Sequence, residues 1–377
     1  MAKIWKKLPP LLADNFGLIE VINQTDGMGI IDDCSEYRTS PDRHSKEGPE
    51  MRVVHTGISS EDVVSGTRQK VLDTFRECEP YFHPGFVLLS TGPCSAMIGT
   101  DLEEIAETIE EESGIPAGRV KLTGQKTYDV GISETLLELA KLLVKPGKEP
   151  RESVNILGGT QLDWQKETAA SFRRWLEERG IPVTAALGGA ETAKNIERAA
   201  EASVNLVVTA SGLAAAKYLK TKYNTPYLVM APFGRSWTDL MLEAVRRKEQ
   251  PGSCPQEEYS RPQVLIIGEQ LMANAIRETL YRDYGMREIQ VCTFYRFEKS
   301  LALPGDRRIK GEEDARELLG SEGLHTVIAD PLLRCFASPS CRWIDLPHKA
   351  FELYGKNRTL PLLLGDHLNR WLDGQMG

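Results

Sequence analysis

The sequence lacks the short motifs that would place it in one of the common enzyme classes. It holds no GxxxxGK[ST] loop, no CxxC pair, no HExxH and no GxSxG. These absences argue against hydrolysis of ATP by the chain itself, and against zinc ribbons, zinc proteases and serine hydrolases. The doublet of Gly27 and Gly29 is not a dinucleotide fingerprint either, because the third glycine is missing.

Long apolar runs and basic clusters are absent as well. No stretch reaches about 18 consecutive apolar residues, the length of a membrane-spanning helix, and the lysines at the start of the chain are not followed by an apolar run. The 46 Lys and Arg residues are outnumbered by 54 Asp and Glu residues, which gives a net charge of −8. We therefore expect a soluble, cytoplasmic protein that binds neither a membrane nor nucleic acid.

Short apolar runs recur between helical patterns throughout the 377 residues, a length that exceeds what one core usually supports. Such runs are typical of buried parallel strands. Their alternation with helices predicts an α/β fold of three doubly wound, Rossmann-like units with parallel sheets. The runs lie near residues 52, 86, 119, 154, 205, 226, 263, 289 and 325.

Two clusters of Pro, Gly, Ser and charged residues, at 144–153 and 249–262, divide the chain. We expect domains over residues 1–148, 149–255 and 256–355. The last helical pattern has no strand after it, so the segment 356–377 is expected to return to the first domain and close it. Within the second domain, one helix is predicted from a cap at Asp163 to Gly180.

The seven cysteines are an odd number in a long chain without a secretion signal, so reduced thiols or metal ligands are expected rather than disulfides. Cys94 follows the run FVLLST through a Gly-Pro turn, and Thr100 or Asp101 is expected to cap the next helix. Ligands of open α/β units bind beyond the carboxyl ends of the strands. Cys94 therefore lies where a ligand would bind, although a buried filler under the turn is an equal alternative.

Cys34 lies in a comparable stretch, TDGMGIIDDCSEYRTS (25–40). This stretch is rich in Gly and Asp and is expected to be a loop that precedes any regular element. A thiolate in such a loop would be accessible enough to ligate iron.

These stretches resemble the first domain of the nitrogenase component 1 family, most closely of its β-type chains. DDCSEYR, HTGISSEDVVSGTRQKVLDTF and STGPCSAMIGTDLEEI are similar to the family's loop with a cluster cysteine, its acidic segment and its second cysteine turn. The resemblance continues through VNILGG, the segment 222–242 and LYGKNRTLPLLLGDHLNRWL, so it covers nearly the whole chain.

The resemblance implies an oxidoreductase subunit that passes electrons from an ATP-dependent iron–sulfur reductase, through an interface [4Fe–4S] cluster, to a small-molecule substrate. Cys34 and Cys94 match two cluster-ligand positions of the family. The cluster would be shared with a second component 1 chain. That chain is either another copy, in a homodimer, or a sister chain in a heterodimer, in which case Asp32 or Asp33 would serve as an oxygen ligand.

Two departures from the family pattern leave other functions open. The family's first cluster cysteine would lie near residues 7–10, where the sequence KLPP offers no thiol. No cysteine occurs from Ser95 to Ser253, whereas the dinitrogen-reducing α-chain anchors its cofactor with one in its second domain, so a dinitrogen-reducing site is not expected. A scaffold for a maturing metallocluster and a binding module without a cluster are the alternatives.

Three other residues carry weaker signals. His348 falls near a position where relatives place a histidine beside their cofactor, although a lone histidine before an apolar segment is more often structural. Cys335 and Cys341 are close in sequence, but without a second pair nearby they are expected to be unrelated loop thiols.

Overall fold

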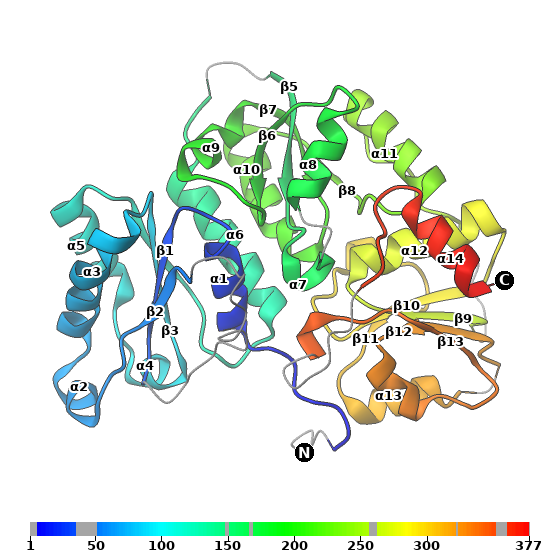
Figure 1. The fold of residues 1–377 in the computed structure, drawn as a ribbon, viewed down its shortest axis with the longest axis horizontal. Coiled ribbons are helices and arrows are strands. Elements are labelled where there is room, and N and C mark those ends of the chain that lie inside the picture. Colours follow the sequence, from blue (N-terminus) through cyan, green and yellow to red (C-terminus); the bar gives the residue numbers. More distant parts are fainter. Residues whose placement is uncertain are drawn as a thin grey trace.

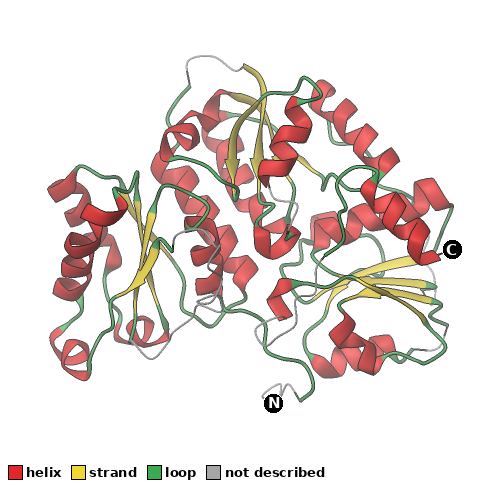
Figure 2. Ribbon diagram, viewed as in Figure 1, coloured by secondary structure: helices red, strands yellow, loops and turns green. Residues whose placement is uncertain are grey.

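The structure of the chain, a computed structural model, describes residues 6–34, 51–147, 151–165, 169–255, 262–321, 323–351 and 360–376. Three all-parallel sheets follow one another along the chain, each flanked by helices (Figures 1 and 2). The expected α/β class with three Rossmann-like units is therefore confirmed. The sheets fall within residues 28–120, 151–229 and 264–345, and we propose domain boundaries near residues 148 and 255, between them.

The first sheet has the strand order β2-β1-β3-β4. Helices α3 and α5 cover one face of this sheet, and α1 and α6 cover the other. Met28 and Ile30 pack into the core under α3 and α5, whereas Ile31 belongs to the core on the opposite face, as the alternation of side chains along a strand requires. The elements are α1 (Asp14–Ile22), β1 (Met28–Asp32), β2 (Val53–His55), α2 (Ser60–Ser65), α3 (Arg68–Phe82), β3 (Val87–Thr91), α4 (Pro93–Ile98), α5 (Leu102–Ser113), β4 (Ala117–Val120) and α6 (Tyr128–Leu143).

The second sheet has the order β6-β5-β7-β8. Its strands are β5 (Arg151–Leu157), β6 (Val183–Leu187), β7 (Ala202–Val207) and β8 (Tyr227–Val229). Its helices are α7 (Gln161–Trp164), α8 (Ala169–Glu177), α9 (Ala193–Glu197), α10 (Leu213–Tyr223) and α11 (Arg235–Arg247), with short 3-10 turns at η1 (Arg198–Glu201) and η2 (Ala210–Gly212).

The third sheet has the order β11-β10-β9-β12-β13. Its strands are β9 (Val264–Ile267), β10 (Ile289–Thr293), β11 (Arg307–Arg308), β12 (Thr326–Ala329) and β13 (Arg342–Asp345). Helices α12 (Gln270–Tyr284), α13 (Glu312–Leu319) and α14 (His367–Met376) and the 3-10 turns η3 (Lys299–Leu301), η4 (Pro331–Phe336) and η5 (Lys349–Phe351) complete the described elements. Within these ranges, no helix combines the length and apolar character that crossing a membrane requires.

A close helix crossing joins the α1 side of the first unit to α6. A Cβ atom at Gly131 would lie 1.8 Å from the carbonyl oxygen of Asp14, and one at Gly17 would lie 2.3 Å from the backbone of Tyr128. Only glycine permits this approach. Helix α6 also packs against α10 of the second unit, so it connects the two units.

The prediction that the C-terminal segment returns to the first domain is wrong for its described part. Helix α14 lies beside α12 of the third unit and near the start of α11 (Figure 1). The side chain of Asn369 explains this position, because it accepts the backbone N–H of Arg235 at 2.8 Å and donates to Asp283 at 2.8 Å. The buried Leu368 and Leu372 add apolar contacts on the same side.

The single helix predicted over 163–180 is also wrong at its start. Helix α7 already begins at Gln161 and ends at Trp164, and Gln165 has a φ of 51°, which an α-helix cannot accommodate. Asp163 therefore lies inside a short helix and is not a cap. The second half of the prediction holds, because α8 ends at Glu177 and Gly180 follows with a φ of 74°.

Candidate metal centre

Cys34 and Cys94 meet at one edge of the first sheet. Strands β1 and β3 are parallel neighbours, with Asp32 beside Thr91, so both chain segments leave the sheet at the same end. The Sγ atoms of the two cysteines are 3.5 Å apart although 60 positions separate them in sequence. The prediction that the two thiols approach each other is confirmed.

The expected loop before Cys34 is a strand. The stretch 25–40 was expected to precede any regular element, but β1 runs through Met28–Asp32 with every residue buried. Two glycines and the short apolar run hid this strand in the sequence. The consequence is that Cys34 follows a strand end in the same way as Cys94 does.

Asp33 is the third member of this group. Its Oδ1 atom accepts the backbone N–H of Cys94 at 3.2 Å, and one ligand atom from each of Asp33, Cys34 and Cys94 lies within 4.8 Å of the others. Asp33 is buried, whereas both cysteines are partly exposed. The three side chains are thus held together at the surface end of the sheet.

Asp32 has a different place from Asp33. Its two carboxylate oxygens accept the hydroxyl groups of Thr56 at 2.8 Å and Thr67 at 2.7 Å, and it is fully buried. Thr67 in turn shares a hydrogen bond with Thr100 at 2.9 Å. Of the two aspartates considered as oxygen ligands, Asp32 joins the loops beneath the site and Asp33 lies beside the thiols.

The chemistry of this donor set fits a metal. The pKa of Cys94 is raised to about 11 by its hydrogen bond with Cys34, and further by the Asp33 carboxylate and by burial. Two thiols and a carboxylate at this distance disfavour one another's ionised forms, and a bound cation would stabilise them together. Thiolates are the protein ligands of iron–sulfur clusters.

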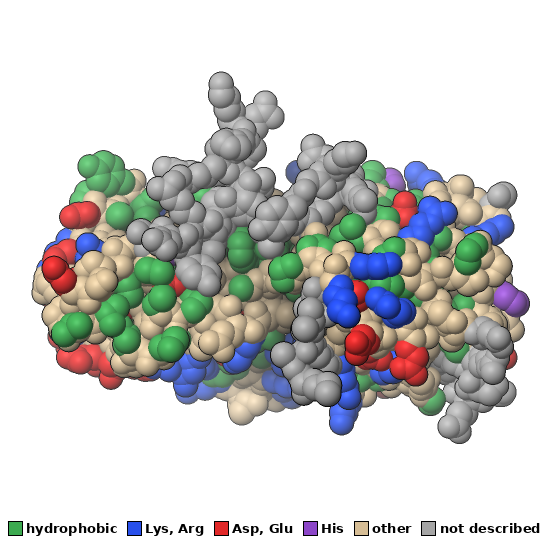
Figure 3. Space-filling view, turned by 90° about the horizontal axis from the view of Figure 1, so that it is seen from below, with side chains coloured by type: hydrophobic (Ala, Val, Ile, Leu, Met, Phe, Trp, Pro, Cys, Tyr) green, Lys and Arg blue, Asp and Glu red, His purple; other side chains and the backbone are tan. Residues whose placement is uncertain are grey.

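Helix α4 carries Cys94 near its start and exposes apolar side chains next to the site. Met97 is 83% exposed and Ile98 is 39% exposed, and Val63 and Val64 of α2 are 41% and 89% exposed. The contact of Thr67 with Thr100 ties the end of α2 to the end of α4. Figure 3, seen from below, shows hydrophobic side chains on this face of the first unit.

The stretch near Lys7, where the family's first cluster cysteine was expected, lies against the third unit. Glu312 Oε2 accepts the backbone N–H groups of Lys6 at 2.7 Å, Lys7 at 2.8 Å and Leu8 at 3.3 Å. These hydrogen bonds lower the pKa of Glu312. This segment therefore brings no side chain to the Cys34 and Cys94 pair in place of the missing cysteine.

The structure does not bring His348 together with the thiol pair. Its Nε2 atom lies 3.2 Å from the hydroxyl oxygen of Tyr128 and 3.6 Å from Asp163, and its ring lies 4.6 Å from that of Tyr295. Tyr128 donates to Asp163 at 2.7 Å. His348 thus belongs to a buried polar group between α6, α7 and the third unit.

Sequence reasoning missed the rest of this buried group. Burial raises the pKa values of Tyr128 and Tyr295, and it raises the pKa of Glu269 to about 8. Glu269 accepts the backbone N–H of Ala210 at 2.8 Å, so it links the third unit to the second. These residues are single polar positions in separate elements, and no spacing in the sequence connects them.

The remaining cysteines do not form a metal site among the described residues. The thiols of Cys335 and Cys341 interact with the carbonyl oxygens of Leu332 and Arg342 respectively. Cys78 lies on α3, where it packs against the core under that helix.

Comparison with known proteins places the chain. Residues 34–261 match the family described as Nitrogenase component 1 type Oxidoreductase, and the chain belongs to this family. It is 26% identical over 260 residues to the nitrogenase molybdenum-iron protein alpha chain of Clostridium pasteurianum, which covers 67% of this chain and 46% of that protein.

Two other relatives carry different names. The light-independent protochlorophyllide reductase of Nostoc punctiforme is similar through its B chain, which is 22% identical over 322 residues, with 74% of this chain and 62% of that protein covered. The nitrogenase iron-molybdenum cofactor biosynthesis protein NifE of Methanosarcina barkeri is 28% identical over 198 residues, with 48% and 41% covered. The chain spans about half the length of these curated relatives.

A solved structure of nitrogenase Cp1 at pH 6.5 has the same fold. It superposes with a TM-score of 0.74 over 99% of this chain and 93% of that chain, at 14% sequence identity.

Proposed function

We propose that this chain is a component 1 type oxidoreductase subunit that holds a [4Fe–4S] cluster through Cys34 and Cys94 at an interface with a second chain. The observation that carries the proposal is the 3.5 Å approach of these two thiols beside Asp33. When bound, the cluster accepts and releases single electrons. Cys34 and Cys94 lose their protons to become thiolate ligands, and the Cys94 N–H stays fixed on Asp33.

The ligand count supports a shared site. A cubane cluster usually takes four thiolates, and this edge of the sheet supplies two. A two-fold axis beside α4 would bring Cys34 and Cys94 of a second copy to the other side of the cluster. The exposed Met97 and Val64 favour such an interface, because apolar side chains of this size are usually buried against a partner.

The electrons would come from an ATP-dependent iron–sulfur reductase, since the chain has no nucleotide-binding loop of its own. Their acceptor would be a small molecule in the region where the three units meet. Tyr128, Asp163 and His348 lie there in hydrogen-bond reach of one another and could hold and transfer a proton during its reduction.

The relation to NifE supports a second candidate, a scaffold on which a metallocluster matures, because that relative is named as a cofactor biosynthesis protein. Both candidates need the thiol pair. They differ in turnover: an oxidoreductase consumes reductant in the presence of an ATPase partner, whereas a scaffold releases its cluster to an acceptor protein. A chain that binds no iron at all would instead be the cluster-free binding module.

The proposal is tested by purifying the chain without oxygen and measuring its mass, iron and labile sulfide together. A dimer with about four irons per two chains, and a reduced-state EPR signal, would support the symmetric site. An iron-free monomer that gains iron only with a second polypeptide would contradict the homodimer and favour the heterodimer.

A further inference from the structure

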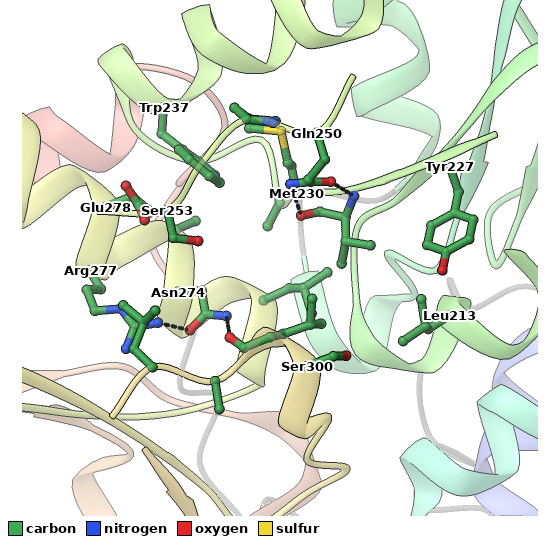
Figure 4. Close-up of a pocket in the computed structure, with 18 of the residues that line it drawn as sticks. Leu213, Tyr227, Met230, Trp237, Gln250, Ser253, Asn274, Arg277, Glu278 and Ser300 are labelled. Carbon is green, nitrogen blue, oxygen red and sulfur yellow. Dashed lines mark hydrogen bonds between the residues drawn. The ribbon is translucent and has the colours of Figure 1, made fainter. Parts of the chain in front are cut away.

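A cavity of about 450 Å³ lies between the second and third units, away from the thiol pair (Figure 4). Its lining includes Val229 and the two residues after it, so it lies beyond the carboxyl end of β8, where open α/β units bind ligands. The opposite wall comes from α12 and η3 of the third unit. The volume is in the range of small-molecule sites, about 300–1,000 Å³.

Most of the wall is apolar. Leu213, Met230 and Trp237 contribute from the second unit, and Leu271 and Leu301 contribute from the third. Figure 4 shows the indole of Trp237 extending from α11 into the space between the units. A ligand that fills this space would therefore have an apolar body.

Two buried N–H donors on the lining residues have no hydrogen-bond partner within the described structure. The Arg277 guanidinium binds Asp306 at 2.7 and 2.8 Å and Asn274 at 2.8 Å, but its Nε–H group is unpaired. The indole N–H of Trp237 is unpaired too. The two residues are only 2% and 4% exposed, so each donor favours an acceptor from a molecule inside the cavity.

The charges around the cavity leave one cation weakly paired. Asp306 balances Arg277, and Arg282 balances Glu278 at 2.8 Å. The Lys217 ammonium group lies 3.9 Å from Glu298, at the limit of an ion pair, and its side chain is 53% exposed. The site therefore fits a ligand with a single negative charge.

We propose that this cavity binds a small organic acid with an apolar body and one anionic group. Its acceptor atoms satisfy the N–H groups of Trp237 and Arg277, and Lys217 balances its charge at the rim. The site is separate from Cys34 and Cys94, so its occupation does not depend on a bound cluster.

The test uses the full-length chain and the aromatic sulfonate anilinonaphthalene sulfonate, whose fluorescence rises in apolar sites. The chain should bind one equivalent saturably. Ala302→Phe adds a ring to a half-exposed residue of the wall and should abolish binding. Trp237→Phe removes one donor and should weaken binding about fivefold. Lys217→Gln should weaken it about threefold.

Lys222→Gln is the matched control, because Lys222 is an exposed lysine of the same helix that does not line the cavity. It should bind the probe as the unmodified chain does. The thermal unfolding of every variant, compared with that of the unmodified chain, shows whether a loss of binding reflects a loss of folding. The exposed position of Lys217 keeps the test available if a core variant fails to fold.

Two results would overturn the proposal. One is the absence of saturable binding to the unmodified chain. The other is binding that Ala302→Phe, Trp237→Phe and Lys217→Gln leave unchanged. Neither result would bear on the iron content, so failure of this proposal is distinguishable from failure of the cluster assignment.

Discussion

The carboxylate of Asp33 accepts the backbone N–H of Cys94 across two neighbouring strand ends, at 3.2 Å. This bond fixes the start of α4 and with it the position of the Cys94 thiol beside Cys34. Asp33 is therefore expected to orient a ligand without being one in a homodimer that supplies four cysteines.

Replacing Asp33 by asparagine tests this role. The amide oxygen of the new side chain would still accept the Cys94 N–H, so iron content should stay near that of the unmodified chain. Asp33→Leu leaves a backbone N–H without its partner, which should cost about 1–3 kcal/mol of unfolding free energy and lower the iron content. Iron loss in Asp33→Asn as complete as in Asp33→Leu would instead make Asp33 a ligand and favour the heterodimer.

Gly92 leaves the space that Asp33 occupies. A Cβ atom at this position would lie 1.9 Å from Asp33 Oδ2. Gly92→Ala should therefore displace the carboxylate, lower the unfolding free energy by about 1–3 kcal/mol and reduce bound iron. Gly252→Ala is the matched control, since its Cβ would meet no atom within 4 Å. Equal stability and iron content in the two variants would contradict the close approach at Gly92.

The buried Glu269 should make stability depend on pH. Burial raises its pKa from the ordinary 4.5 to about 8. The folded state then holds its proton more tightly than the unfolded state does, so the stabilisation is fully present below pH 4.5 and is lost as the pH rises toward 8. Denaturant unfolding across this interval should show a decline of a few kcal/mol, at about 1.4 kcal/mol per pKa unit.

Glu269→Gln removes this titration. Its unfolding free energy should decline less between the same two pH values, although it loses one acceptor for the N–H groups of Ala210 and Met272. Parallel pH profiles for the variant and the unmodified chain would show that Glu269 has an ordinary pKa in the folded state.

Glu312 should anchor the start of the chain without affecting the metal centre. Glu312→Ala removes the acceptor shared by the N–H groups of Lys6, Lys7 and Leu8. Hydrogen exchange at these amides should become faster, while iron content should not change. A parallel loss of iron would mean that this segment contributes to the site after all.

Much of the fold was predictable because buried parallel strands are continuous apolar runs. All nine predicted runs are strands. Four further strands were missed because they are short or carry few large apolar residues: β1 begins Met-Gly, β6 holds two alanines, and β11 and β13 are edge strands with arginine. The position of α14 was not predictable, since it depends on Asn369 reaching Arg235 and Asp283 from a distant part of the chain.

The candidate site divides in the same way. Cys34 and Cys94 could be paired from the sequence, because parallel strands end at the same edge of a sheet. The choice between Asp32 and Asp33 could not be made, since it depends on which carboxylate meets Thr56 and Thr67. The group around Tyr128, Asp163 and His348 also escaped prediction, because its members come from three separate elements.

The iron content of Cys94→Ser, purified without oxygen, tests the central claim most directly. Cys78→Ser is the control, because Cys78 packs on α3 away from the pair. The account predicts that Cys94→Ser loses its iron and sulfide while Cys78→Ser retains both, with both variants folded by circular dichroism. Iron unchanged in Cys94→Ser would contradict the assignment of the metal centre.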